Sequence, residues 1–183
     1  MNDVLEQTRL LVLEEQSINL TSKEALFEQL RQWSIEDRKV TPLKTFQGMV
    51  WEQGFKSGAI KGHMYPDVKP ALQRWLNGGL KLAIFSSGSI AAQKQLFGFS
   101  TEGDLTPYFS AYFDTTTGMK RDEQTYHLIV QQLHASANSV LFLSDIHQEL
   151  EAAHATGLRT LQLVRPGTQA NWSSCVADFS EIQ

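Results

Sequence analysis

Three segments of the sequence carry hydroxyl, ammonium and carboxylate groups, each directly after a short apolar run. The first, Ser86-Ser87-Gly88-Ser89, follows a run that ends at Phe85 and precedes a predicted helix. Small hydroxyl residues and a glycine at the start of a helix let backbone N–H groups and hydroxyls surround an oxyanion. Ser86 and Ser87 are therefore candidate phosphate-binding residues. A plain helix N-cap by Ser89 is the alternative explanation of this tetrad.

The second segment, residues 114–120, leaves the short apolar run at 111–113 and ends at Lys120. An ammonium placed at this position could neutralise a phosphate as a point charge. A solvated surface lysine is the alternative. Asp114 is a second-rank candidate, because its carboxylate could serve the site or could simply cap the turn.

The third segment delivers Ser144-Asp145 at the end of the apolar run 140–143. Mg²⁺ in proteins is usually held by one or two carboxylates together with substrate oxygens and water. Asp145 is therefore a candidate metal ligand, with helix N-capping as the alternative. Glu149, four residues further on, is explained equally well as a first-turn helix acid.

Other polar residues give weaker signals. His147 and His154 lie seven positions apart, and no close third ligand joins them, which argues against zinc. Arg165-Pro166-Gly167 is most simply a turn. The single Cys175 is predicted to be an ordinary free thiol, because no second cysteine exists with which it could pair.

The elements that position these segments alternate between strand and helix from about residue 64 onward. Strands are predicted at 80–85, 111–113, 139–143 and 160–164, and helices at 66–77, 90–97, 124–133 and 148–156. Short apolar strands joined by helices are typical of an open, doubly wound parallel sheet. In such a sheet the ligand binds beyond the carboxyl ends of the strands, where all three polar segments lie.

Residues 1 to about 60 predict a separate helical unit, since they show apolar residues at helical intervals and no strand pattern. Thr21 and Glu24 have the spacing of a capping box for the second helix. Pro42 predicts the start of a third helix, with Phe46, Val50 and Phe55 facing inward.

Composition limits the class of protein. The chain has 183 residues, of which 42% are hydrophobic, enough for one core with a small appended unit. Its net charge is -4 and its basic residues are scattered, which argues against a nucleic-acid partner. The sequence shows neither a run of about eighteen apolar residues nor a leader pattern, so we expect a cytoplasmic protein with no membrane partner. The sequence has no heptad seam, and we expect a monomer.

The order of hydroxyl, lysine and acid segments resembles motifs two, three and four of the haloacid dehalogenase (HAD) superfamily of phosphatases. More narrowly, several strings resemble the enolase-phosphatase family of methionine salvage. These strings are residues 62–68, 86–98, 112–114 and 142–150. The likeness extends from about residue 35 to about residue 164.

The resemblance implies a HAD-like core over residues 62–183, with a helical cap over residues 1–61 that closes over the pocket. It implies a Mg²⁺-dependent enzyme acting on a small phosphorylated substrate. The enzyme would enolise 2,3-diketo-5-methylthiopentyl-1-phosphate and hydrolyse its phosphate to give the acireductone 1,2-dihydroxy-3-keto-5-methylthiopentene. Ser86 and Ser87 would contact the phosphate, Lys120 would neutralise it and Asp145 would bind Mg²⁺.

One part of the family pattern is missing. The family begins with a central strand that ends in an Asp-x-Glu-Gly-Thr-type loop, and the Asp of that loop attacks phosphorus. This chain offers no catalytic residue of that kind, because no apolar strand precedes Asp3. We therefore expect the nucleophile upstream of Met1, as in an N-terminally truncated chain. Two alternatives stay open: an inactive remnant that binds phosphate ligands, and a phosphatase of another small phosphometabolite.

Overall fold

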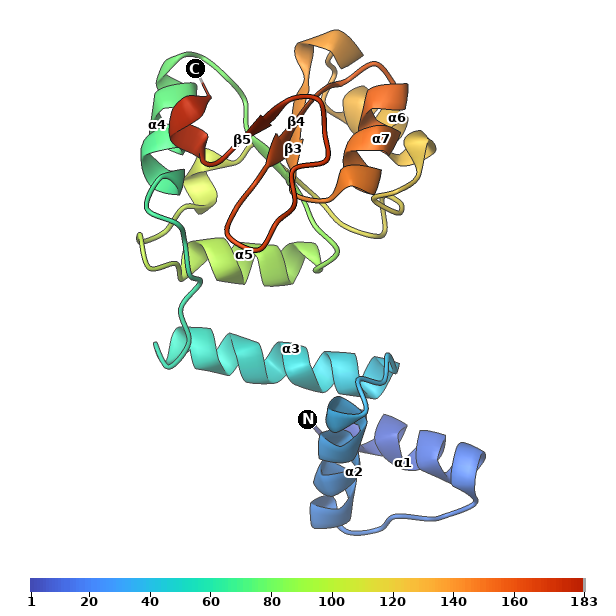
Figure 1. Ribbon diagram of the computed structural model, residues 1–183. Helices are drawn as coiled ribbons and strands as arrows, with labels where there is room; N and C mark the ends of the chain where they lie inside the picture. Colours follow the sequence, from blue (N-terminus) through green and yellow to red (C-terminus); the bar gives the residue numbers. More distant parts are fainter. Residues whose placement is uncertain (183) are drawn as a thin grey trace. The chain divides into compact units, whose positions relative to one another are not determined.

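The computed structural model describes residues 1–182 and shows two compact units, Met1–Ile60 and Lys61–Gln183. Figure 1 shows helices alone in the first unit and strands flanked by helices in the second. Among the described residues, no helix combines the length and apolar character needed to cross a membrane.

The first unit consists of three helices around one hydrophobic cluster. Its helices are α1 (Asn2–Gln16), α2 (Lys23–Ile35) and α3 (Thr41–Lys56). Leu30 and Trp33 of α2 lie at the centre of the cluster and are almost fully buried. Residues from all three helices complete it, namely Val4, Leu5, Val12, Leu26 and Leu43.

Two local predictions for this unit are wrong. The capping box at Thr21 and Glu24 is displaced by one position, because the Ser22 hydroxyl caps α2 by accepting a hydrogen bond from the Ala25 N–H. Val50 was expected to face inward but is 47% exposed, whereas Phe55 is buried as expected.

The second unit alternates strands and helices as predicted. Its helices are α4 (Val68–Asn77), α5 (Ile90–Gly98), α6 (Glu123–Gln132) and α7 (His147–Ala155). Its strands are β1 (Ala83–Phe85), β2 (Ala111–Phe113), β3 (Leu141–Ser144), β4 (Arg159–Leu163) and β5 (Cys175–Val176). Three short 3₁₀ helices, Thr106–Tyr108, Ala137–Ser139 and Phe179–Glu181, complete it.

All the strand pairs are parallel, which confirms the predicted doubly wound α/β architecture. The strands form two hydrogen-bonded groups, β1-β2 and β3-β4-β5. β1 is shorter than predicted, because Gly79 has a positive φ and the Leu80 N–H donates to the Trp75 carbonyl. Residues 78–80 therefore end α4 as a helix C-terminal turn and do not start the strand.

Helices cover both faces of the strands. Figure 1 shows α4 on one side of β3 and β4, and α6 and α7 on the other. One cluster packs α4 residues against Leu143 and Leu161. A second cluster, centred on the buried Tyr126, includes Phe85 of β1 and Phe142 of β3.

β1 and β3 end their respective groups, so each has an edge that pairs with no other strand among residues 1–182. Strands in a parallel sheet covered by helices are normally buried on both faces. Here no residue of β1 is buried, and Ser144 is the only buried residue of β3. The Tyr126 ring nevertheless contacts both strands, with centroids 5.9 Å from Phe85 and 5.1 Å from Phe142.

Candidate functional site

Parallel pairing and the contacts of Lys120 bring the predicted polar segments to one edge of the core. Phe85 pairs with Phe113, and Ser144 pairs with Gln162, so within each group of strands the loops after these residues leave in the same direction. The Lys120 ammonium joins the two groups, because it lies 5.7 Å from the centroid of the Phe85 ring and 2.6 Å from Glu149 Oε2 in the helix after β3. This is the edge at which doubly wound proteins bind their ligands.

The hydroxyl segment forms a tight loop at the start of α5. Ser89 caps the helix by accepting a hydrogen bond of 3.2 Å from the Ala92 N–H, so the capping alternative is correct for that serine. The Ser86 hydroxyl accepts a hydrogen bond from the Gly88 N–H at 3.1 Å. Ser87 is exposed and Ser86 is half-buried, so both hydroxyls lie near solvent.

The Asp114 carboxylate makes hydrogen bonds to two segments, its own loop and the start of α5. Its carboxylate accepts hydrogen bonds from the Thr116 hydroxyl at 2.6 Å, the Thr116 N–H at 2.9 Å and the Ile90 N–H at 3.0 Å. These bonds, led by the one from the Thr116 hydroxyl, hold the pKa of Asp114 below its ordinary value. The structure thus accounts for Asp114 as a turn cap that also reaches the first N–H of α5.

Lys120 is bound to an acid that the sequence left unassigned. Its ammonium lies 2.6 Å from Glu149 Oε2, and the same oxygen accepts a hydrogen bond of 2.8 Å from the Ser144 hydroxyl. The side chains of Lys120 and Glu149 are 21% and 10% exposed. Tyr126 donates to the Lys120 carbonyl at 2.6 Å, and burial raises the pKa of that phenol. Glu149 therefore holds the lysine in place from the first turn of α7.

Lys120 and Asp145 line the same hollow, of about 440 Å³, at the carboxyl edge. Its walls are mixed, with Val68, Leu143 and Phe179 as apolar members. Within the described part of the chain, the Asp145 carboxylate has no hydrogen-bond or ion-pair partner. Ser86 and Ser87 are not among the lining residues, although the Lys120 ammonium lies 5.7 Å from the ring of Phe85, immediately before Ser86.

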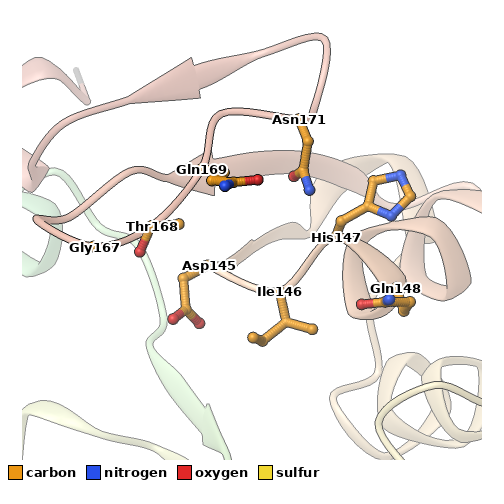
Figure 2. A pocket seen from close by; sticks show the side chains of 8 residues that line it. All are labelled: Asp145, Ile146, His147, Gln148, Gly167, Thr168, Gln169 and Asn171. Atoms are coloured by element: carbon orange, nitrogen blue, oxygen red, sulfur yellow. The ribbon is translucent and has the colours of Figure 1, made fainter.

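A smaller hollow of about 260 Å³ shares Asp145 and Thr168 with the larger one (Figure 2). Figure 2 shows the loop 167–171 facing Asp145 and Ile146 across it. The fully buried Gln162 fixes this loop, since its amide donates to the Gln169 carbonyl and the Asn171 side chain and accepts from the Asn171 N–H. The same amide lies 3.3 Å from the Asp145 carbonyl.

Arg165 was expected to be part of a plain turn, but it makes a partly buried ion pair. Its guanidinium donates to Asp67 at 2.6 Å and lies 4.3 Å from the centroid of the Tyr65 ring. Burial would raise the pKa of Asp67, but Arg165 and the Phe179 N–H outweigh it, so the pKa lies below its ordinary value. The pair ties the start of α4 to the segment after β4 and adds a second cation to the larger hollow.

The donor set at this edge fits Mg²⁺ in part. Asp145 offers one unpaired carboxylate, and no group of three His, Cys, Asp or Glu side chains converges anywhere in residues 1–182. Magnesium commonly takes one or two protein carboxylates and fills its other positions with substrate oxygens and water. A single carboxylate beside a hollow that also holds Lys120 is compatible with that arrangement.

Comparison with known proteins identifies the family. The sequence model of the haloacid dehalogenase-like hydrolases matches residues 1–163. The chain belongs to this family. The predicted hydrolase class is thereby confirmed, and the match begins well before residue 35, where the sequence analysis placed the start of the likeness.

Two relatives of this hydrolase point to one group of enzymes within the family. Enolase-phosphatase E1 of Picosynechococcus sp. is 48% identical over 180 residues, covering 98% of this chain and 78% of the relative. Enolase-phosphatase E1 of Pseudomonas fluorescens is 52% identical over 160 residues, covering 87% of this chain and 70% of the relative. These matches confirm the predicted resemblance to the enolase-phosphatases.

Solved structures agree on the fold of this hydrolase. The UTR4 protein of Saccharomyces cerevisiae is 33% identical, with a TM-score of 0.79 over 97% of this chain and 85% of that one. CbbY of Rhodobacter sphaeroides, solved with phosphate, has a TM-score of 0.62 over 98% of this chain and 89% of its own, at 14% identity. The second likeness concerns the fold alone.

The contacts of Glu149 predict a cost for removing its charge. Glu149→Gln leaves the half-buried Lys120 ammonium without a carboxylate, so we expect the free energy of unfolding to fall by about 1–3 kcal/mol. Glu151→Gln on the same helix is the control, because Glu151 is exposed and faces only His147 at 3.3 Å. That control should change stability by less than about 0.5 kcal/mol. Equal urea denaturation curves for the two variants would contradict this account of Glu149.

The hydrogen bonds of Asp114 predict a pH-dependent contribution to stability. A carboxyl with a lowered folded-state pKa stabilises the protein above its ordinary pKa, and loses that contribution as the pH falls through the folded value. The difference in melting temperature between wild type and Asp114→Asn should therefore be complete at neutral pH and shrink below about pH 4. Thr116→Val, which removes the leading hydrogen bond, should move that decline to higher pH. A difference that stayed constant between pH 7 and pH 2.5 would contradict the assignment.

Proposed function

We propose that this hydrolase is an enolase-phosphatase that converts 2,3-diketo-5-methylthiopentyl-1-phosphate into the acireductone and phosphate with the help of Mg²⁺. The similarity to enolase-phosphatase E1, over 98% and 87% of this chain in the two relatives described, is the observation that supports this most strongly. The hollow lined by Lys120 and Asp145 supports the proposal, and the contact of Lys120 with the ring of Phe85 brings the loop of Ser86 toward it.

In this proposal each candidate residue has one task. The hydroxyls of Ser86 and Ser87 and the ammonium of Lys120 bind the equatorial oxygens of the phosphate as charge shifts during transfer. Glu149 and Ser144 orient Lys120 through the contacts already described. Asp145 supplies a carboxylate ligand to Mg²⁺, which would neutralise phosphate charge.

The attacking carboxylate is proposed to lie on a strand that inserts between β1 and β3. Both strands have an open edge, each is parallel to its neighbour in its own group, and both contribute a ring that contacts Tyr126. Neighbouring strands lie about 4.8 Å apart, so one intervening strand would separate β1 from β3 by about 10 Å, a span that one tyrosine ring can bridge. The partial exposure of β1 and β3 is also consistent with an unfilled position in the sheet.

A carboxylate at the end of that strand would lie beside Lys120. Its oxygen would form the new bond to phosphorus while the bond from phosphorus to the substrate oxygen breaks. Water would then hydrolyse the aspartyl phosphate, releasing phosphate and regenerating the carboxylate. The helical unit Met1–Ile60 is proposed as the cap that excludes water from this chemistry and shapes the site for the methylthio group.

The first test is phosphate release with Mg²⁺ from the diketo phosphate and from simple phosphate esters. In an enzyme complete with its nucleophile, Asp145→Asn should reduce Mg²⁺-dependent turnover by at least about a hundredfold, because a metal ligand is lost. Asp104→Asn changes an exposed acid that accepts hydrogen bonds from Thr106 and does not line the hollow, so it should leave turnover unchanged. Wild-type activity in Asp145→Asn would contradict the metal assignment. Equal turnover of the diketo phosphate and simple esters would contradict the substrate.

The second test concerns the position between β1 and β3. A chain extended at its N-terminus by an apolar strand and an Asp-x-Glu-Gly-Thr loop should be more stable to urea and should gain turnover. The same extension with its Asp replaced by Asn should keep the gain in stability and lose the turnover. A scrambled extension is the control for added length. If the apolar extension gave no more stability than the scrambled one, the proposed insertion would be wrong.

A further inference from the structure

We propose that Gln93 is a positioning residue that ties the hydroxyl loop after β1 to the loop after β2. Gln93 is the fourth residue of α5 and is only 5% exposed. Its Nε2 group donates to the Gly88 carbonyl and to the Phe113 carbonyl, each at 2.8 Å. A primary amide has two N–H donors, so a single side chain serves both loops.

The Phe113 carbonyl is a shared acceptor. Besides the bond from Gln93, it accepts a hydrogen bond of 3.1 Å from the Ser86 N–H. The backbone of the first candidate phosphate residue and the buried amide are therefore anchored on the same oxygen. Asp114, the next residue, accepts from the Ile90 N–H and so links the same two loops a second time.

The glutamine makes its two hydrogen bonds at the cost of one unpaired polar atom of its own. The Oε1 atom of Gln93 is buried and has no hydrogen-bond partner within residues 1–182. An unpaired buried acceptor is unfavourable, and an apolar side chain of the same length would avoid that cost but would lose both donated hydrogen bonds. What the glutamine supplies is a pair of donors directed at two carbonyls, one in the loop after β1 and the other at the end of β2.

The consequence for the site rests on the proposed function. Ser86 and Ser87 are in the first loop, and the second loop leads to Lys120. Because Gln93 fixes the carbonyl of Gly88 against that of Phe113, it sets the separation between the hydroxyls and the chain that carries the ammonium. Groups that bind one phosphate together depend on such separations, and a displacement of about 1 Å can reduce a rate by about a hundredfold.

The experiment compares Gln93→Met with Gln95→Met in the chain as it exists. Methionine keeps the length of glutamine and removes both donors. Gln95 lies two positions along α5 and is half-buried, and the described residues give its side chain no hydrogen bond. In Gln93→Met, hydrogen exchange of backbone amides should accelerate in residues 86–90 and 113–118 together. In Gln95→Met, it should accelerate in neither segment. Unchanged exchange in Gln93→Met would overturn the proposal.

Binding of inorganic phosphate, measured by calorimetry at a temperature where both variants are folded, gives the functional readout. We expect at least about tenfold weaker binding by Gln93→Met than by Gln95→Met. Equal affinities would overturn the positioning role. If the wild-type chain bound no phosphate, the phosphate-site assignment itself would fail, and the exchange experiment would still decide whether Gln93 ties the two loops.

A glutamate variant tests whether the hydrogen bonds that Gln93 donates, rather than the size of its side chain, hold the two segments. The carboxylate of Gln93→Glu cannot donate to either carbonyl, whereas its protonated form can donate to one. In Gln93→Glu, the protection of both segments from backbone hydrogen exchange should therefore recover in part as the pH is lowered. Gln95→Glu is the reference for this comparison. A merely structural requirement for a side chain of this size would show no such recovery, and its absence would count against donation as the cause.

Discussion

Parallel strand pairing is the constraint on which the rest of the core depends. Within each group it sends the loops that follow the strands toward the same edge, and it requires strands whose backbone groups are paired and whose faces are covered. The consequence for the loops is seen at the ends of β1 and β3, which the candidate residues follow. The requirement for paired backbone groups is unmet along the open edges of β1 and β3. These unpaired edges are the structural basis for proposing an inserted strand.

Buried polar side chains, rather than apolar packing, hold the loops at that edge. Gln93 and Gln162 each use one amide to fix two backbone segments, which for Gln162 are the loop 167–171 and the carbonyl of Asp145. Glu149 and Asp67 each pair with a cation from a different loop. A buried amide or carboxylate is costly unless its hydrogen bonds are made, so such residues define one geometry and penalise others.

The sequence was informative where a signal is local. Apolar runs and the polar residues that follow them located β2, β3 and β4 and the candidates Ser86, Lys120 and Asp145, whose functional roles stay predictions. The partners of Glu149 and Arg165 could not be predicted, because an ion pair between residues 29 or 98 positions apart leaves no periodic trace. Gln162 left a faint signal, a polar residue inside an apolar strand. The two-residue β5 was missed because it is too short to show a pattern.

Each unit of the chain buries a hydrophobic cluster of its own, with Leu30 and Trp33 at the centre of one and Tyr126 in another. Substitutions in the three helices can therefore be accepted or rejected by natural selection on their own packing, without matching changes around the strands. This separation would let the helical unit change its sequence quickly while the loops at the strand ends change slowly.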